Sequence, residues 1–217
     1  MDTKKKENLG NLAQAGREWE PQGRPTKVRP YTFPDPELGH VRPYGIYDLS
    51  RNEGWVNVGI SRDTAQFAVE SIRRWWHRMG HERYPQARDL LITADGGGSN
   101  GYRTRLWKAE LQRLATELQV TIRVCHFPPG TSKWNKIEHR MFSFISKNWR
   151  GRPLDSIATV VNLIASTTTD KGLYIATSVD NTIYEKGIEV SDEDFAALRI
   201  TGEKFHGEWN YVIKPQR

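Results

Sequence analysis

The sequence predicts an α/β fold in which a mixed sheet is flanked by helices on both sides. Two short apolar runs, 90–94 and 121–127, have the length and composition of buried strands, and a helical pattern follows each of them. Before them, residues 44–60 alternate apolar and polar side chains around a turn, which is typical of a β-hairpin. Helices that alternate with apolar strands beside a hairpin indicate the mixed α/β class.

The composition limits the partners and the compartment. The chain has 217 residues, enough for one domain with a small appendage, and its 32 basic and 26 acidic residues give a net charge of +6. This excess suits a nucleic-acid partner, although many soluble proteins share it. The eight tryptophans can fill the core or offer flat surfaces to bases. A single cysteine, Cys125, excludes an internal disulfide and indicates a reducing compartment.

The N-terminal part begins with an irregular stretch, residues 7–43, that is rich in glycine, proline and charge. The hairpin follows, with residues 50–53 as its turn. Asp63 or Thr64 can then start a helix that runs to about Met79. These signals predict two paired strands and one amphipathic helix before the first buried strand.

The middle of the chain carries the strongest pattern. The strand 90–94 ends at Asp95 and is followed by a glycine-rich run at 96–101 and a helix at about 102–118. The strand 121–127 then leads into a Pro-Pro-Gly turn at 128–130. A strand that is apolar throughout suits a position buried on both faces.

A long helix is predicted from Ser132, placed as its N-cap, to about Trp149. Apolar side chains recur at the three- and four-residue steps of one buried face: Trp134, Ile137, Met141, Phe142, Phe144, Ile145 and Trp149. The remaining predicted elements are a helix at 156–168, a strand near 174–179, a short capped helix at 191–198 and a last strand at 209–213.

Two carboxylates stand out as a candidate site. Glu138 lies on the apolar face of the predicted helix, where a carboxylate needs a cation, a hydrogen bond or a metal ion. A salt bridge with Arg140 or Lys133 would satisfy that need without any function. Asp95 ends a buried strand, which is where ligand sites of open α/β sheets lie. The two acids can therefore converge on one site.

Two-metal phosphoryl transfer requires a small cluster of carboxylates, and hard Mg²⁺ ions take oxygen ligands. A third acid is then needed, and Asp2, Asp48 and Glu110 are among those available. Asp48 resembles a turn residue and Glu110 a residue on a helix surface. The pattern of the residues alone does not select among the three.

Residues near these acids can contact DNA. The glycine run either forms a flexible turn or allows a nucleic-acid backbone to approach, with Ser99 and Asn100 donating to phosphate. Clusters of basic residues are usually solvated helix faces, but those beside the acids are candidates for phosphate contacts. These candidates are Arg103, Arg105, Lys108, Lys133, Lys136, His139 and Arg140. His126 and His139 could assist proton transfer, but two-metal chemistry does not need it, so structural or DNA-contact roles are expected for both.

Three motifs together resemble one known family. They read LITADGGGSN at 91–100, HFPPGTSKWNKIEH at 126–139 and FHGEWNY at 205–211. The combination is similar to the Rhodopirellula-type DDE transposases of bacterial insertion sequences. The resemblance implies a ribonuclease H-like fold and an Asp-Asp-Glu triad that depends on Mg²⁺, with Mn²⁺ as an alternative and two ions in the site. It also implies cutting and joining of DNA at the ends of the element.

The family motifs also assign the acids. Asp95 matches the second acid of the triad and Glu138 the third. The run DTKKK at 2–6, followed by Asn11 and then GREW at 16–19, matches the context of the first acid, so Asp2 is the predicted first member. Asp2, Asp95 and Glu138 are therefore the predicted catalytic and metal-binding residues.

The resemblance sets the remaining expectations. Residues 1–170 are expected to form the catalytic domain, with 7–43 as an irregular insertion, and 171–217 a C-terminal extension packed on it. Because family members carry more chain before the first acid, we expect a truncated first strand. The alternative function is then an inactive remnant that only binds DNA or full-length transposase. Expected partners are element ends, target DNA and further copies of the chain in a synaptic complex.

No apolar run approaches the eighteen residues of a membrane span, and the N-terminus lacks the apolar segment of a secretory signal. Together with these absences, the resemblance implies the bacterial cytoplasm, in association with the nucleoid, as the expected location.

Overall fold

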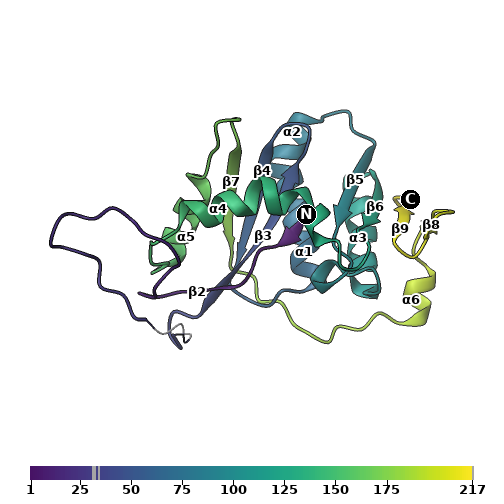
Figure 1. Cartoon of the computed structure of the whole chain (residues 1–217). Coiled ribbons are helices and arrows are strands. Elements are labelled where there is room, and N and C mark those ends of the chain that lie inside the picture. Colours follow the sequence, from purple (N-terminus) through teal and green to yellow (C-terminus); the bar gives the residue numbers. More distant parts are fainter. Residues whose placement is uncertain (31–32, 34, 217) are drawn as a thin grey trace. The chain divides into compact units, whose positions relative to one another are not determined.

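The computed structural model describes residues 1–30, 33 and 35–216, and Figure 1 shows the course of the chain. The side chain of Ser132, the predicted N-cap, lies outside the described residues. The chain divides into two compact units. The first unit comprises Met1–Asp2, Arg62–Asn135 and Ile183–Arg217, and the second comprises Thr3–Ser61 and Lys136–Thr182. No helix among the described residues is long and apolar enough to cross a membrane.

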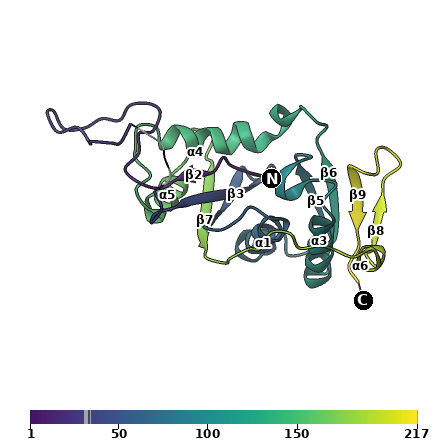
Figure 2. The ribbon, with the colours of Figure 1, turned by 90° about the horizontal axis from the view of Figure 1, so that it is seen from below.

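The first unit contains a four-stranded mixed sheet in the order β5-β6-β9-β8. Its strands are β5 (Asp89–Ala94), β6 (Thr121–His126), β8 (Ile200–Gly202) and β9 (Asn210–Ile213). Strands β5 and β6 are parallel, whereas β9 is antiparallel to both β6 and β8. Figure 2 shows the β8–β9 hairpin beside β6, with the short helix α6 (Asp192–Ala196) near one end.

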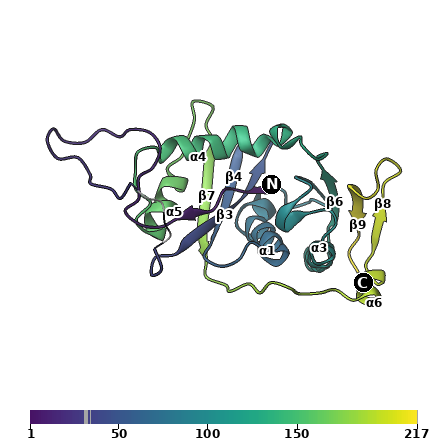
Figure 3. The same cartoon turned by 60° about the horizontal axis from the view of Figure 1, so that its bottom comes forward.

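Two helices of the first unit lie side by side in this fold (Figure 3). Helix α1 (Ala65–Trp75) is capped by Thr64, whose hydroxyl accepts from the amide of Phe67, and it continues through the π turn η1 (Trp76–Gly80) into α2 (His81–Arg83). Helix α3 (Arg105–Leu118) links β5 to β6, after the 3-10 turn η2 (Gly98–Asn100). Its apolar face is buried, as predicted.

The second unit contains the other sheet, in the order β1-β3-β4-β7, with β2 paired to β3. Its strands are β2 (Glu7–Asn8), β3 (His40–Asp48), β4 (Glu53–Gly59) and β7 (Tyr174–Asp180), and the two-residue strand β1 (Asp2–Thr3) falls on the boundary between the units. Strands β3 and β4 form the predicted antiparallel hairpin, and β7 is parallel to β4. Mixed sheets with helices confirm the predicted α/β class, although the strands form two sheets instead of one.

Two helices cover the second sheet. The π turn η4 (Glu138–Phe142) continues into α4 (Ser143–Asn148), and α5 (Ile157–Ala165) is capped by Ser156. Figure 3 shows η4 and α4 running across the strands. Apolar residues of the strands and of both helices form one buried cluster, which includes Val56, Val58, Met141, Phe142, Ile145, Val160 and Ile164.

Two glycines let η4 approach the strands closely. A Cβ atom at Gly45 would lie 2.5 Å from Cε1 of Phe142, and one at Gly54 would collide with the sulfur of Met141. Any larger residue at these two positions would take up the space that Phe142 and Met141 occupy, because even a methyl group would overlap their side chains. The glycines of β3 and β4 therefore fix the distance between the sheet and the turn that begins at Glu138.

Several predicted details are wrong. The single helix 132–149 is a separate 3-10 turn η3 (Ser132–Trp134), the π turn η4 and α4, and Trp134 is 53% exposed because it precedes the helix. Strand β5 is not buried on both faces, since Leu91 is 63% exposed. The stretch 7–43 is not irregular throughout: Glu7 and Asn8 pair with Val41 and His40 at the start of β3.

Candidate active site

Asp95 directly follows β5, and its backbone is held in place by two side chains. The amide nitrogen of Asn100 donates to the Asp95 carbonyl at 3.1 Å, and Nδ1 of His126 lies 3.0 Å from the same oxygen. Asn100 comes from η2, while His126 ends the parallel neighbour β6. The turn after β5 is therefore fixed from both the glycine-rich loop and the next strand.

His126 belongs to a chain of hydrogen bonds whose direction can be assigned. Because a carbonyl only accepts, Nδ1 of His126 carries the proton that is donated to Asp95. Nε2 then accepts from the Tyr211 hydroxyl at 3.0 Å, and the Tyr211 oxygen accepts from Nε1 of Trp107 at 2.9 Å. Burial lowers the pKa of His126 and raises that of Tyr211, so both are neutral. This arrangement gives His126 a structural contact with the Asp95 backbone, while the alternative of a DNA contact stays a prediction.

Asn135 brings two of the predicted acids together. Its side-chain nitrogen lies 3.1 Å from Oδ1 of Asp95 and 3.5 Å from Oδ2 of Asp2, and 3.3 Å from the Met1 carbonyl. Met1 is itself tied to β5, since its nitrogen donates to the Thr93 carbonyl at 2.9 Å. Asn135 is 2% exposed, so its amide is a buried donor shared by two carboxylates. Two like charges near one point favour a bound cation.

Glu138, the third predicted acid, opens the π turn η4 in the second unit, three positions after Asn135. Its side chain is partly buried. Within the described part of the chain, no group of three or more His, Cys, Asp or Glu side chains is arranged to hold a metal ion. The structure thus brings Asp2 and Asp95 together, while the assignment of Glu138 to the same site stays a prediction.

The other acids that were considered have structural contacts. Asp48 Oδ1 accepts from the amides of Ser50 and Arg51, as expected of a turn residue. Glu110 is not on the helix surface as predicted: it is 7% exposed and accepts from Arg113 at 2.7 Å and Gln66 at 3.3 Å. It is buried because α3 turns this position inward toward α1. There Gln66 of α1 donates to the Glu110 carboxylate, and Arg113 of α3 compensates its charge.

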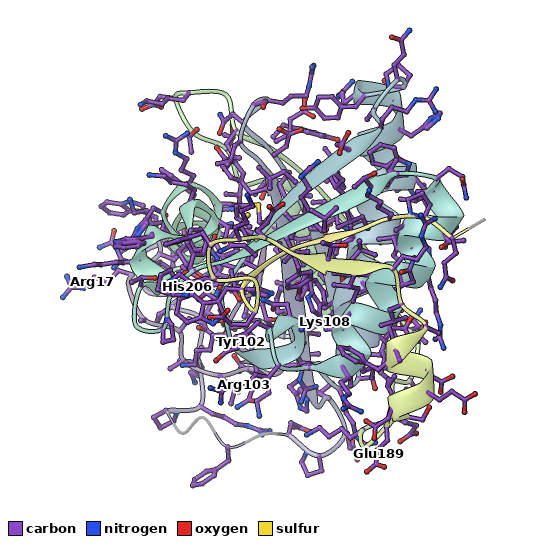
Figure 4. All side chains as sticks on the ribbon, turned by 90° about the vertical axis from the view of Figure 1, so that its right-hand side faces the viewer. Arg17, Tyr102, Arg103, Lys108, Glu189 and His206 are labelled. Atoms are coloured by element: carbon purple, nitrogen blue, oxygen red, sulfur yellow. The ribbon has the colours of Figure 1, made fainter. Side chains whose placement is uncertain are left out.

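The predicted DNA contacts differ in accessibility. Ser99 and Asn100 are buried, and Asn100 serves Asp95. Arg105 pairs with Asp192 at 2.5 Å, and the Lys108 ammonium lies 5.1 Å from the Tyr211 ring centre, with its pKa lowered by burial. The remaining candidates are exposed: Arg103, Lys133, Lys136, His139 and Arg140. Figure 4 shows Arg103 and Lys108 among the side chains of the first unit.

No role was predicted for Asn135, although it lies in the motif that carries Glu138. The signal that could have found it is its place between Trp134 and Ile137 near a helix start, since an amide that becomes buried needs hydrogen-bond partners. The partnership of His126 with Tyr211 had no such signal, because it joins residues 85 positions apart.

Comparison with known proteins adds one match. A family model described as the Rhodopirellula transposase DDE domain matches residues 1–215. No curated protein and no solved structure matches the chain. The match spans nearly the whole sequence and agrees with a mixed α/β fold in which acids follow β5 and open η4. This chain belongs to the family of Rhodopirellula transposase DDE domains.

Proposed function

We propose that this transposase domain cleaves DNA strands and joins the freed ends to target DNA, with Asp2, Asp95 and Glu138 as its catalytic acids. The observation that carries the proposal is the buried amide of Asn135, which lies between the carboxylates of Asp2 and Asp95. In a member of a DDE transposase family, two acids gathered in this way are the expected start of a catalytic site.

The residues suit divalent metal ions. Carboxylate oxygens are the ligands that Mg²⁺ and Mn²⁺ prefer, and Asp2 and Asp95 already share one point of contact. Asp2, Asp95 and Glu138 would hold the ions. When bound, a pair of such ions activates the attacking oxygen and stabilises the leaving one during in-line phosphoryl transfer.

The chain itself supplies position and charge. Asn135 keeps the carboxylates of Asp2 and Asp95 oriented, while Asn100 and His126 hold the Asp95 backbone. Exposed basic residues such as Arg103 and Lys136 would contact phosphates of the DNA. Because orientation of the reacting groups accounts for much of phosphoryl-transfer catalysis, these contacts matter more than any proton transfer by the protein.

The test is Mg²⁺-dependent nicking of DNA that carries candidate element ends. We expect Asp95→Asn to lower the nicking rate by at least about a thousandfold, because the isosteric amide loses the charge that a metal ligand needs. The matched control is Asp89→Asn on the same strand, whose side chain is 56% exposed and pairs with Arg123 at 3.4 Å. That variant should nick at the wild-type rate.

Equal nicking by wild type and Asp95→Asn would refute the assignment of the acids. A wild-type chain that binds DNA yet never nicks it, with either ion, would favour the inactive remnant instead. Glu138→Gln extends the test to the third acid: it should lose activity as completely as Asp95→Asn if both hold the same ions.

A further inference from the structure

A pocket of about 510 Å³ lies on the first unit, between the end of β6 and the loop 203–209 that joins β8 to β9. Its walls include His126, Phe205, His206, Trp209 and Glu203. The proposed function uses none of its aromatic residues except His126. The same loop carries the motif FHGEWNY, which no part of the catalytic proposal explains.

The aromatic rings around the pocket form a continuous series. The Phe205 ring meets His206 edge-on at 4.4 Å, and His206 stacks on Trp209 at 4.9 Å with an interplanar angle of 18°. Tyr102 touches Trp209 edge-on at 6.0 Å and lies 6.1 Å from the ring of His126. Figure 4 labels His206 and Tyr102. Because Phe205 is 75% exposed, this series of rings still offers an aromatic surface on which another planar ring can stack.

The backbone of the loop 203–209 keeps the phenyl ring of Phe205 exposed to solvent. Phe205 is 75% exposed, although burial of a phenyl ring is favourable. The Asn210 side chain donates to the carbonyls of Phe205 at 3.1 Å and of His206 at 3.3 Å. His206 has a φ of 48°, and a Cβ at Gly207 would lie 2.8 Å from the Glu203 carbonyl. Such strain is kept at sites that bind ligands.

The charges around the pocket distinguish a base from a phosphate. Glu203 lines the pocket, and Glu208 lies 3.2 Å from Nδ1 of His206, so two carboxylates disfavour an anion among the rings. A cation stands outside the rings, since the Arg103 guanidinium lies over Tyr102 at 5.1 Å. A nucleotide of a DNA strand matches this arrangement if its base enters the pocket and its phosphate lies beside Arg103.

We propose that this pocket binds an unstacked nucleobase of a DNA strand, with Trp209, His206 and Phe205 as the stacking surface. The position suits a base near the cleaved bond, because His126 lines the pocket and also contacts the Asp95 carbonyl. The proposal rests on the proposed function only in taking DNA as the substrate. A base that leaves the duplex loses its stacking interactions, and stacking on protein aromatic rings replaces them.

The experiment measures the affinity of the full chain for a fluorescein-labelled oligo-dT strand and for the same strand paired with oligo-dA. Stacking of one base is worth roughly 1–3 kcal/mol, so Trp209→Ala and Phe205→Ala should each weaken single-strand binding by about five- to a hundredfold. Duplex binding should change by less than about twofold, because a paired strand offers no free base. The matched control is Phe33→Ala, which removes a ring that is 78% exposed and lies outside the pocket.

Unchanged single-strand affinity in Phe205→Ala and Trp209→Ala, or an equal loss in Phe33→Ala, would overturn the proposal. Phe205→Ala removes an exposed ring, so its result stands even if Trp209→Ala fails to fold. If free dTMP binds as tightly as the strand, and the variants weaken both equally, the site serves a nucleotide and the DNA assignment is wrong. The nicking rate of Asp95→Asn is a separate readout, so failure of the catalytic assignment is recognised independently of single-strand binding.

Discussion

Asp95 and Glu138 are positioned by different kinds of interaction. Around Asp95 the contacts are hydrogen bonds from Asn100, Asn135 and His126, which fix the direction of particular oxygens. The turn that starts at Glu138 is instead fixed by apolar packing of Phe142 against Gly45 and its neighbours. Hydrogen bonds give orientation at modest net free energy, whereas close packing gives most of the stability. Variants of the two regions should therefore fail in different ways.

The largest effect is expected in the packed region. Gly45→Ala places a Cβ 2.5 Å from the ring of Phe142, which is buried and has no room to move. We therefore expect the free energy of unfolding to fall by about 1–3 kcal/mol. Thermal or urea unfolding measures it. Gly97→Ala is the control, because nothing lies within 4 Å of its Cβ. Equal stability of the two variants would mean that η4 does not pack against β3.

A loss of activity with little loss of stability is expected in the hydrogen-bonded region. Asn135→Ala removes the donor shared by Asp2 and Asp95, and a shift of about 1 Å in reacting groups costs roughly a hundredfold in rate. The free energy of unfolding should fall by only about 1–2 kcal/mol. Nicking rates and unfolding curves of the same preparations separate the two effects.

The matched control for Asn135→Ala is Asn148→Ala. The Asn148 amide, at the end of α4, also donates to several oxygens, those of Leu163, Ser166 and Thr167, and none of these partners is a predicted acid. It should lose similar stability and keep its nicking rate per folded molecule. If both variants lose activity alike, Asn135 acts only through the fold.

The smallest effect is expected from surface charges, which contribute neither packing nor orientation. Glu117 pairs with Arg73 at 2.8 Å and with His77 at 3.3 Å. Partial burial raises the pKa of Glu117, but the contacts with Arg73 and His77 outweigh it and leave this pKa below its usual 4.5. The stabilisation is therefore present above about pH 4.5 and is lost as the pH falls through the lowered pKa.

Because the Glu117 side chain is 40% exposed, solvent screens the pair, and Glu117→Gln should lower stability by less than about 1 kcal/mol at neutral pH. Unfolding midpoints between pH 6 and pH 3 give the measurement, with Glu82→Gln as control, since the Glu82 side chain is 76% exposed beside Arg83. The difference between Glu117→Gln and wild type should disappear in acid. A difference that persists would show that packing, not charge, is involved.

Local signals account for the parts of the fold that could be predicted. The helices predicted to start at Asp63 or Thr64, near Ser156 and at Ser191 are capped by Thr64, Ser156 and Ser191, because an N-cap hydroxyl needs only the next turn of its own chain. The hairpin β3–β4 and the strands β5 and β6 followed from patterns of a few residues. Strands β2 and β8 could not be predicted, since strands of two or three residues are too short to show an alternating pattern.

Long-range contacts account for what could not be predicted. The sharing of Asn135 between Asp2 and Asp95 joins residues 133 and 40 positions apart, and no spacing in the sequence reports it. The burial of Glu110 depends on Gln66 of another helix. The motif resemblance selected Asp2 from several acids, and that assignment and those of Asp95 and Glu138 stay predictions until nicking is measured.

The π turn at Glu138–Phe142 makes the length of this segment critical. Such a turn holds one residue more than an α turn, so the chain on its two sides is out of phase with an ordinary helix. Deleting His139 or Arg140, both exposed, would remove that extra residue and so change the angle of Glu138 around the helix axis relative to Phe142. Substitutions at these two positions leave that angle unchanged, so the orientation of Glu138 depends on the number of residues in the turn and not on the side chains of His139 and Arg140.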